Sequence, residues 1–297
     1  MGLWFSVARS FVLRPLTLHC VLAAVDLTDG SEAALQTASS LARLTDARLI
    51  VLHAALTRTS ETEDDIANWV RMTIPGNHQP DDVRIVVAEA ADVIAEHAER
   101  VSADVIVLGP HRQRQRTGRL GSTADRVVRR AQTPCLVVPR PLALPLDRVL
   151  VPVDLTDAAN GALLVGLSWA SALRRPSRNA QAQPTELEVI HVSSDAQQRS
   201  DAERALHRHV ERVHARVAAA TGVAIRECVE QAEDPAAAIL QHVNKGQVDL
   251  AVLGTHGRTT HQRDLLGSVS SAVVRQCNGP VLLVPPEVWR DHARLAA

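Results

Sequence analysis

The chain alternates between short, continuously apolar runs and longer stretches in which apolar residues recur every three or four positions. Short apolar runs are typical of strands buried on both faces, whereas the longer period is typical of amphipathic helices. In the first half, strands are predicted over 20–25, 48–54, 83–89, 104–109 and 135–139. Helices are predicted over 31–44, 63–74, 92–101 and 122–131, the first with Ser31 as its N-cap.

The same alternation returns in the second half of the chain. Strands are predicted over 148–153, 187–192, 223–228, 250–254 and 281–285, and helices near 159–173, 201–221, 234–245 and from 268. The sequences themselves also match, because CVLAAVDLT at 20–28 aligns with RVLVPVDLT at 148–156. Further on, GSTADRVVRRAQTPCLVVP at 121–139 aligns with GSVSSAVVRQCNGPVLLVP at 267–285. One structural unit has therefore been duplicated.

The duplication defines the expected domains. Two domains are predicted over 19–140 and 148–288, joined by a linker at 141–147 within a Pro-rich stretch. We expect residues 1–18 to form a flexible N-terminal extension. Because strands and helices alternate, each copy is predicted to form an α/β domain with a parallel sheet covered by helices on both faces.

Ligands of such sheets bind outside the carboxyl ends of the strands. The residues at those positions are Asp26 and Asp154, which follow the first strand of each copy, and the loops after Gly109 and Gly254. A ligand-binding site is therefore expected at these positions.

The amino-acid composition excludes several classes of protein. The 32 basic and 33 acidic residues nearly cancel, which excludes a strongly basic nucleic-acid-binding protein. Aromatic residues are only 2% of the chain, too few for a base-stacking platform. Lys245 is the sole lysine and does not lie in a P-loop motif. The four cysteines lack C-x-x-C spacing and no apolar run is long enough to span a bilayer, so we expect a cytoplasmic protein with reduced thiols and no membrane contact.

The loop after the fourth strand of the second copy carries the clearest motif. It contains Gly254, Gly257 and Gly267 in the pattern G-x2-G-x9-G, followed by Ser268 at the start of a helix. Glycines let a backbone approach a ligand closely, and the free N–H groups of a helix N-terminus favour anions. The pattern suits a phosphate cradle without lysine, although a Gly-rich turn before a helix capped by Ser268 has the same sequence.

This glycine motif resembles the nucleotide loop of the universal stress protein family. The segments VPVDLT at 151–156 and PVLLVP at 280–285 are also similar to that family, and the resemblance extends over both copies. It implies two tandem flavodoxin-like (adenine nucleotide alpha hydrolase-like) domains with strand order 3-2-1-4-5. It also implies that the two copies pair through their fifth strands within the chain; a homodimer beyond that pair stays open. Many members of the family bind ATP, and in this chain we expect Mg²⁺ to accompany the phosphates of the bound ATP.

The resemblance also implies roles for individual residues of the second copy. Asp154 would lie at the adenine–ribose end, unless it only caps the next helix, and Val192 would lie near the base, unless it belongs to the core. The loop residues Gly254 and Gly257 would fold over the ribose and α-phosphate. The β- and γ-phosphates would be held by Gly267, Ser268 and the backbone N–H of Val269.

The first copy departs from the motif. Arg112 replaces the second glycine, and Pro110 removes one N–H donor, so we expect this copy to bind ATP poorly or not at all. Asp26, Gly121 and Ser122 remain and could hold an anion weakly. The same loop is rich in arginine over 112–119, either as a solvated surface or as a patch for an acidic partner.

Two functions from different classes follow. The first is an ATP-binding universal stress protein with a regulatory role in the stress response and an unknown protein partner. The alternative is an interaction scaffold that needs no nucleotide. His256, His261 and Asp264 lie in the second loop, but no nucleophile and base stand in a recognisable catalytic motif. We therefore expect no dedicated enzyme, with slow ATP hydrolysis left open.

Overall fold

The computed structural model describes residues 18–55, 60–74, 76, 79–110, 122–174, 184–194, 199–216, 222–245, 247–256 and 266–289. Several predictions fall outside these residues: the extension at 1–17, the Arg-rich loop 112–119, Gly121 and Gly257. The backbone of Ser122 is described, but its side chain is not.

The predicted strands and helices are present in both halves. In the first half the strands are β1 (Cys20–Val25), β2 (Arg48–Ala55), β3 (Asp82–Val87), β4 (Val105–Leu108) and β5 (Cys135–Val137). The helices of this half are α1 (Asp29–Thr45), α2 (Ser60–Thr73), α3 (Ala90–Arg100) and α5 (Ser122–Arg130). The second half has β6 (Arg148–Pro152), β7 (Thr185–Ser193), β8 (Val223–Gln231), β9 (Leu250–Gly254) and β10 (Val281–Val284). Its helices are α6 (Ala159–Ala172), α7 (Arg199–His214), α8 (Pro235–Lys245) and α9 (Ser268–Gln276).

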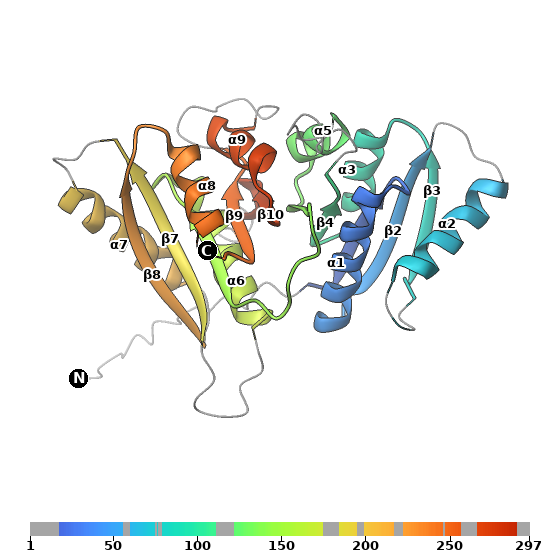
Figure 1. The fold of residues 1–297 in the computed structure, drawn as a ribbon, viewed down its shortest axis with the longest axis horizontal. Coiled ribbons are helices and arrows are strands. Elements are labelled where there is room, and N and C mark those ends of the chain that lie inside the picture. The colour runs from blue at the N-terminus through green and yellow to red at the C-terminus, as the bar shows by residue number, and fades with distance from the viewer. Residues whose placement is uncertain are drawn as a thin grey trace, which may run out of the picture.

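The ten strands found among the described residues form one sheet in the order β3-β2-β1-β4-β5-β10-β9-β6-β7-β8. Neighbours within each half are parallel, and each half has the order 3-2-1-4-5 that the family resemblance implies. The halves meet where β5 and β10 pair antiparallel, with Leu136 opposite Leu282. Figure 1 shows the two halves side by side about this seam. The internal pairing through the fifth strands is therefore confirmed.

Helices cover both faces of the sheet and bury two cores. One core contains side chains of α1, α2, α6 and α7, among them Leu35, Ile66, Leu163 and Leu206. The other contains side chains of α3, α5, α8 and α9, among them Ile94, Val127, Ile239 and Val273. Within the described part of the chain, none of the helices is long and apolar enough to cross a membrane.

Two local predictions are corrected by the structure. Ser31 is not an N-cap, because α1 already begins at Asp29; its buried hydroxyl instead donates to the Asp26 carboxylate at 2.7 Å. Helix α7 ends at His214 rather than near residue 221. The N–H of Arg216 bonds to Val213 O, three residues back, as in the tightened last turn of a helix, and its guanidinium stacks over Trp289.

The segment between the halves is packed against both of them. Leu142 and Leu146 are buried, and the Leu142 N–H donates to Thr37 Oγ1 of α1. On the other side, the carbonyl of Leu146 accepts a hydrogen bond from Thr185 Oγ1 of β7. These contacts tie the connection to the first helix of one half and to a strand of the other.

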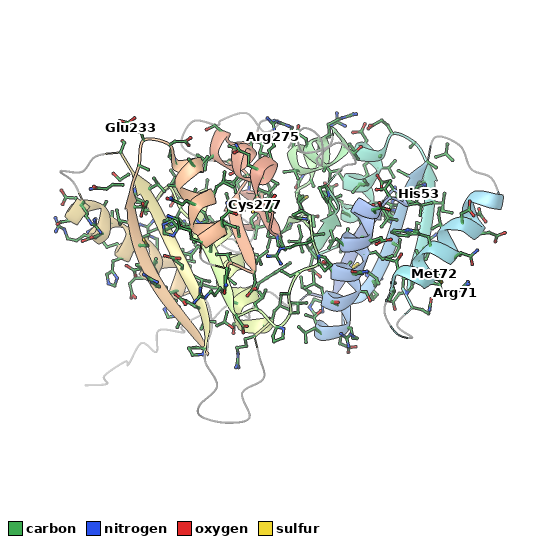
Figure 2. The ribbon with its side chains drawn as sticks, in the orientation of Figure 1. His53, Arg71, Met72, Glu233, Arg275 and Cys277 are labelled. Atoms are coloured by element: carbon green, nitrogen blue, oxygen red, sulfur yellow. The ribbon has the colours of Figure 1, made fainter. Side chains whose placement is uncertain are left out.

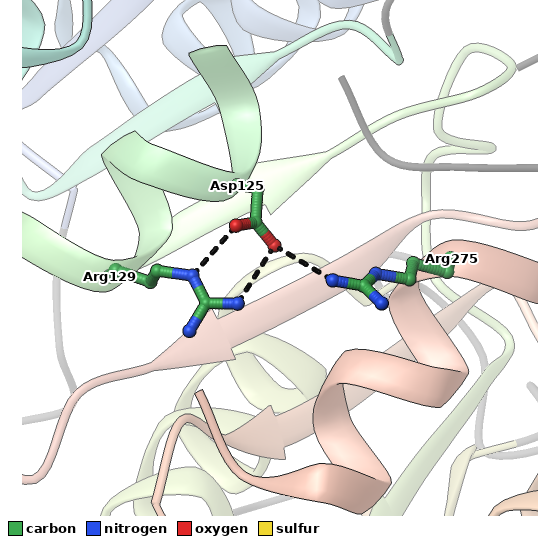
Figure 3. A network of polar contacts seen from close by, with 3 residues as sticks. All are labelled: Asp125, Arg129 and Arg275. Atoms are coloured by element: carbon green, nitrogen blue, oxygen red, sulfur yellow. Dashed lines mark hydrogen bonds and ion pairs between the residues drawn. The ribbon is translucent and has the colours of Figure 1, made fainter. Parts of the chain in front are cut away.

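A polar network crosses the seam above the β5–β10 pair. Asp125 of α5 accepts hydrogen bonds from Arg129 Nε at 2.7 Å and Nη2 at 3.2 Å, and contacts Arg275 Nη2 of α9 at 3.5 Å (Figure 3). The Asp125 carboxylate thus contacts one arginine from each half.

Removing this charge is expected to have a small, salt-dependent effect. We expect Asp125→Asn to lower the free energy of unfolding by about 0.5–1 kcal/mol, because partly exposed ion pairs contribute little. Urea unfolding at low and high salt measures this change in the free energy of unfolding. A double-mutant cycle with Arg275→Gln isolates the contribution of the contact between the two halves. Asp65→Asn, an exposed change on α2, is the matched control. A loss that does not shrink at high salt would contradict the electrostatic account.

Candidate functional site

The turn after the first strand has the same unusual conformation in both halves. Asp154 Oδ1 accepts hydrogen bonds from Thr156 N at 3.1 Å and Oγ1 at 2.6 Å, and Leu155 between them has φ of 64°. In the first half, Asp26 holds Thr28 in the same way, and Leu27 has φ of 59°. A positive φ is costly for leucine and persists only where the surroundings enforce it. The Asp–Thr contact fixes this turn at the edge of the sheet where ligands bind.

A cavity of about 270 Å³ opens at this edge in the second half. It lies where β6, β7 and β9 end and α6, α8 and α9 begin, which is the crevice expected for a parallel sheet. Its walls combine apolar side chains with a few polar groups, as small-molecule sites do. The lining residues are Pro152, Val153, Asp154, Ala159, Ile190, His191, Val192, Pro235, Ile239, Leu253, Gly254, His256, Gly267, Ser268, Val269 and Ser270.

The structure brings the predicted residues of the second half to this one cavity. Residues that follow β6, β9 and the β9–α9 loop face the same space as the end of β7. Those that were predicted and line it are Asp154, Val192, Gly254, Gly267, Ser268 and Val269. Gly257 lies outside the described residues.

Hydrogen bonds hold the two ends of the β9–α9 loop together. The Gly267 N–H donates to Thr255 O at 2.8 Å, and Ser270 Oγ donates to Gly254 O at 2.6 Å. The first hydrogen bond within α9 runs from Ser271 N to Gly267 O. The N–H of Gly267 is thus engaged, and the backbone donors that precede the first helical bond are those of Ser268, Val269 and Ser270. These N–H groups and the helix dipole make an anion-favouring end.

Sequence reasoning missed His191, which also lines the cavity. Its Nδ1 donates to Val153 O at 2.8 Å, since a carbonyl can only accept, and in the neutral ring Nε2 remains an acceptor. His53, labelled in Figure 2, makes the equivalent contact with Val25 O at 2.9 Å in the first half. Both histidines stand two residues before the end of the strand that pairs with the first strand of their half, but the sequence alone does not show which strand is that neighbour.

Sequence reasoning also missed the wall that α8 provides. Pro235 and Ile239 of α8 line the cavity together with Ile190 and Val192 of β7. Their positions gave no chemical signal, because proline is ordinary at a helix start and isoleucine is ordinary in a core.

The corresponding region of the first half is packed more tightly. A Cβ added to Gly109 would lie 2.1 Å from Gly30 O, and one added to Gly30 would lie 2.5 Å from Pro110 O. At the equivalent Gly254 the nearest atoms are His256 O at 3.4 Å and Ala158 O at 3.5 Å. The end of β4 therefore rests directly on the first turn of α1.

A buried histidine near the site, His209, is expected to make the stability of the folded chain sensitive to acid. His209 is 1% exposed, and neither ring nitrogen has a hydrogen-bond partner among the described residues. Burial lowers the pKa of His209 below 6.5, and the charge of Arg212 acts in the same direction. The unfolded chain therefore binds this proton more readily than the folded one. The free energy of unfolding should fall as the pH drops below 6.5.

We expect His209→Leu to weaken this pH dependence without removing it, because burial lowers the pKa of His97 as well. Urea unfolding at about pH 5.5 and about pH 7.5 compares the two conditions on either side of the histidine range. His214→Gln, an exposed change on the same helix, is the control. Identical pH slopes for the wild type and His209→Leu would contradict the assignment.

Comparison with known proteins places the chain in a family. The sequence model of the universal stress protein family matches residues 18–139 and again residues 145–285. A curated universal stress protein of Methanocaldococcus jannaschii is 44% identical over 50 residues, which cover 17% of this chain and 29% of that protein. That match spans less than a third of the relative.

Solved structures share the fold over nearly the whole chain. A universal stress protein from Archaeoglobus fulgidus superposes with a TM-score of 0.63 at 21% identity, covering 90% of this chain and 98% of that one. A functionally unknown protein from Pseudomonas aeruginosa gives a TM-score of 0.60 at 19% identity, covering 94% and 97%. The family model matches twice and covers most of the chain, so this protein belongs to the universal stress protein family as a tandem member.

Proposed function

We propose that the second half binds ATP with Mg²⁺ in the cavity bordered by β6, β7, β9 and the start of α9. The observation that carries the proposal is the convergence of Asp154, Val192, Gly254 and Ser268 on one cavity. Membership of the family supports a role in the stress response. The nucleotide would act as the regulatory ligand in that role, and a protein partner would read the bound state.

The inner part of the cavity suits a base and a ribose. Ile190, Val192 and Ile239 offer apolar surface to a base. A ribose hydroxyl donates well to a carboxylate, and Asp154 is partly buried and held in place by Thr156. His191 Nε2 adds an acceptor for a nucleotide hydroxyl or amino group.

The outer part suits phosphates. The backbone N–H groups of Ser268, Val269 and Ser270 stand at the α9 N-terminus, and α9 carries no acidic residue in its first turn. No lysine or arginine is among the described residues that line the cavity. Backbone donors alone leave most of a triphosphate charge uncompensated, so Mg²⁺ would supply the rest.

The first half is proposed to leave its equivalent position without nucleotide. The backbones of Gly30 and Gly109 approach each other more closely than those of Ala158 and Gly254 do in the second half, which leaves less room beside the end of β4. Asp26 Oδ1 is also engaged by Ser31 Oγ, whereas Ala159 in the equivalent place has no hydroxyl.

A calorimetric titration of the nucleotide-free chain with Mg·ATP tests the proposal. We expect one site per chain. Two sites would show that the first half also binds. No binding by a folded, nucleotide-free chain would overturn the proposal and favour the nucleotide-independent scaffold.

A further inference from the structure

A second cluster of ligand-type side chains lies outside the proposed nucleotide site. Cys228, Glu230 and His242 can each present one ligand atom, and these atoms all lie within 4.8 Å of one another. We propose that these residues form a zinc site in the second half, with water in the fourth position and Glu188 orienting the imidazole. The site is independent of nucleotide binding.

The fold explains why the three side chains meet. Cys228 and Glu230 are two residues apart on β8, so both point to the face of the sheet that α8 covers. His242 lies in the last turn of α8, which packs on that face. Ile239, one turn earlier on α8, lines the nucleotide cavity, and Val192, which pairs with Glu230, does so too. The cluster therefore lies directly behind one wall of that cavity.

The distances are close to those that a metal requires. Bond lengths of about 2.0–2.3 Å in a tetrahedral zinc site place neighbouring ligand atoms roughly 3.3–3.8 Å apart. His242 Nε2 already lies 3.5 Å from Glu230 Oε2. Small side-chain rotations would bring Cys228 Sγ within the same range, because all three atoms are within 4.8 Å.

Glu188 occupies the position of a supporting residue. Its Oε1 lies 3.8 Å from Nδ1 of His242, on the ring nitrogen that does not face Glu230. Histidines that bind metals commonly donate their other N–H to a carboxylate, which fixes the ring and raises its basicity. A slight approach of Glu188 would complete such a contact.

Two carboxylates lie beside the cluster. Glu186 on the same strand as Glu188 is paired with Arg148 and Arg226, whereas the ion pairs of Glu188 and Glu230 among the described residues are both with His242. Arg148, Arg226 and Lys245 line the cavity next to these carboxylates. The side chains of Glu188 and His242 are 19% and 25% exposed, so water screens this charge only in part. A dication bound by Cys228, Glu230 and His242 would offset the repulsion between the two carboxylates.

The donor set selects the metal. A thiolate, an imidazole and a carboxylate suit zinc, whereas Mg²⁺ and Ca²⁺ prefer oxygen ligands alone. The alternative is a simple ion pair in which protonated His242 lies between two glutamates. That arrangement would not involve the Cys228 thiol.

The first half provides an internal comparison. The strand register places Arg84 and Val86 of β3 where β8 has Cys228 and Glu230. His97 of α3 stands where α8 has His242, but neither of its nitrogens has a partner among the described residues. The fold thus forms without these ligands, so structural need alone does not explain their presence in the second half.

The test uses the full chain, stripped with a chelator and titrated with Co²⁺ as a spectroscopic probe of the zinc position. We expect one Co²⁺ per chain with a thiolate-to-metal charge-transfer band, lost when Zn²⁺ is added. Cys228→Ser should abolish the band, and Glu230→Gln should weaken Zn²⁺ binding at least tenfold. Glu188→Gln should weaken it by about 10–100-fold, as loss of a supporting carboxylate does.

Controls separate the site from folding and from other thiols. Glu227→Gln removes a carboxylate from the opposite face of β8 and should leave binding unchanged. Circular dichroism checks each variant, and His242→Gln replaces Cys228→Ser if the latter does not fold. Zn²⁺ binding should also release the thiol proton to the buffer, seen as a buffer-dependent heat. No charge-transfer band in the wild type, or a band that survives in folded Cys228→Ser, would overturn the proposal.

Discussion

Ser268→Glu is expected to weaken Mg·ATP binding about 30-fold while the chain stays folded. The new carboxylate would stand at the α9 N-terminus, where the phosphates are proposed to lie. Repulsion between like charges about 4 Å apart costs roughly 1–4 kcal/mol near a protein surface. A loss of about 2 kcal/mol corresponds to roughly 30-fold in affinity, and calorimetric titration measures it.

The same substitution separates binding from stability. An acidic residue in the first turn of a helix stabilises it by about 0.3–1 kcal/mol, and α9 has none there. The free energy of unfolding without nucleotide should therefore stay constant or rise. Ser122→Glu, at the start of α5 in the first half, is the matched control and should leave Mg·ATP binding unchanged. Wild-type affinity in Ser268→Glu would place the phosphates elsewhere.

Gly109→Ala is expected to destabilise the chain far more than Gly254→Ala, although the two positions are equivalent. The added methyl at Gly109 would lie 2.1 Å from Gly30 O and 2.7 Å from Gly30 C. Both atoms belong to the backbone, so a whole turn of α1 must shift. Overpacking of this kind costs about 1–3 kcal/mol, and we expect the upper end of that range.

At Gly254 the nearest atoms are 3.4 Å and 3.5 Å away, which is ordinary contact. We expect Gly254→Ala to change the free energy of unfolding by less than about 1 kcal/mol, within the range of uncrowded substitutions. Urea unfolding of both variants in the absence of nucleotide compares them directly. Equal losses would show that the first half is no more tightly closed than the second.

Much of the fold was predictable because local patterns report local structure. Continuous apolar runs such as Val105–Leu108 are typical of strands covered on both faces, and alternation with helices indicates parallel pairing. The duplication was visible in the repeated VDLT and G-S segments. Strand order and the pairing of β5 with β10 came from the family resemblance, since periodicity does not specify which strands are neighbours.

The candidate site was predictable where backbone chemistry leaves a sequence signal. A carboxylate after a strand, as at Asp154, and glycine before a helix, as at Gly267, mark the edge of the sheet where ligands bind. The contributions of His191 and Ile239 carried no such signal. Their presence at the cavity depends on which strand and helix lie beside β6, and that is a matter of packing.

The fold class, the duplication and the half with the intact glycine motif can be predicted from the amino-acid sequence, because they follow from periodicity and residue type along a continuous stretch. Three contacts become visible only in the folded chain: Gly30 lies against Gly109, Ser31 binds Asp26 instead of capping α1, and Cys228 lies near His242. These contacts join segments through the packing of helices on the sheet. Their distances depend on how closely two elements approach, which no local pattern of residues encodes.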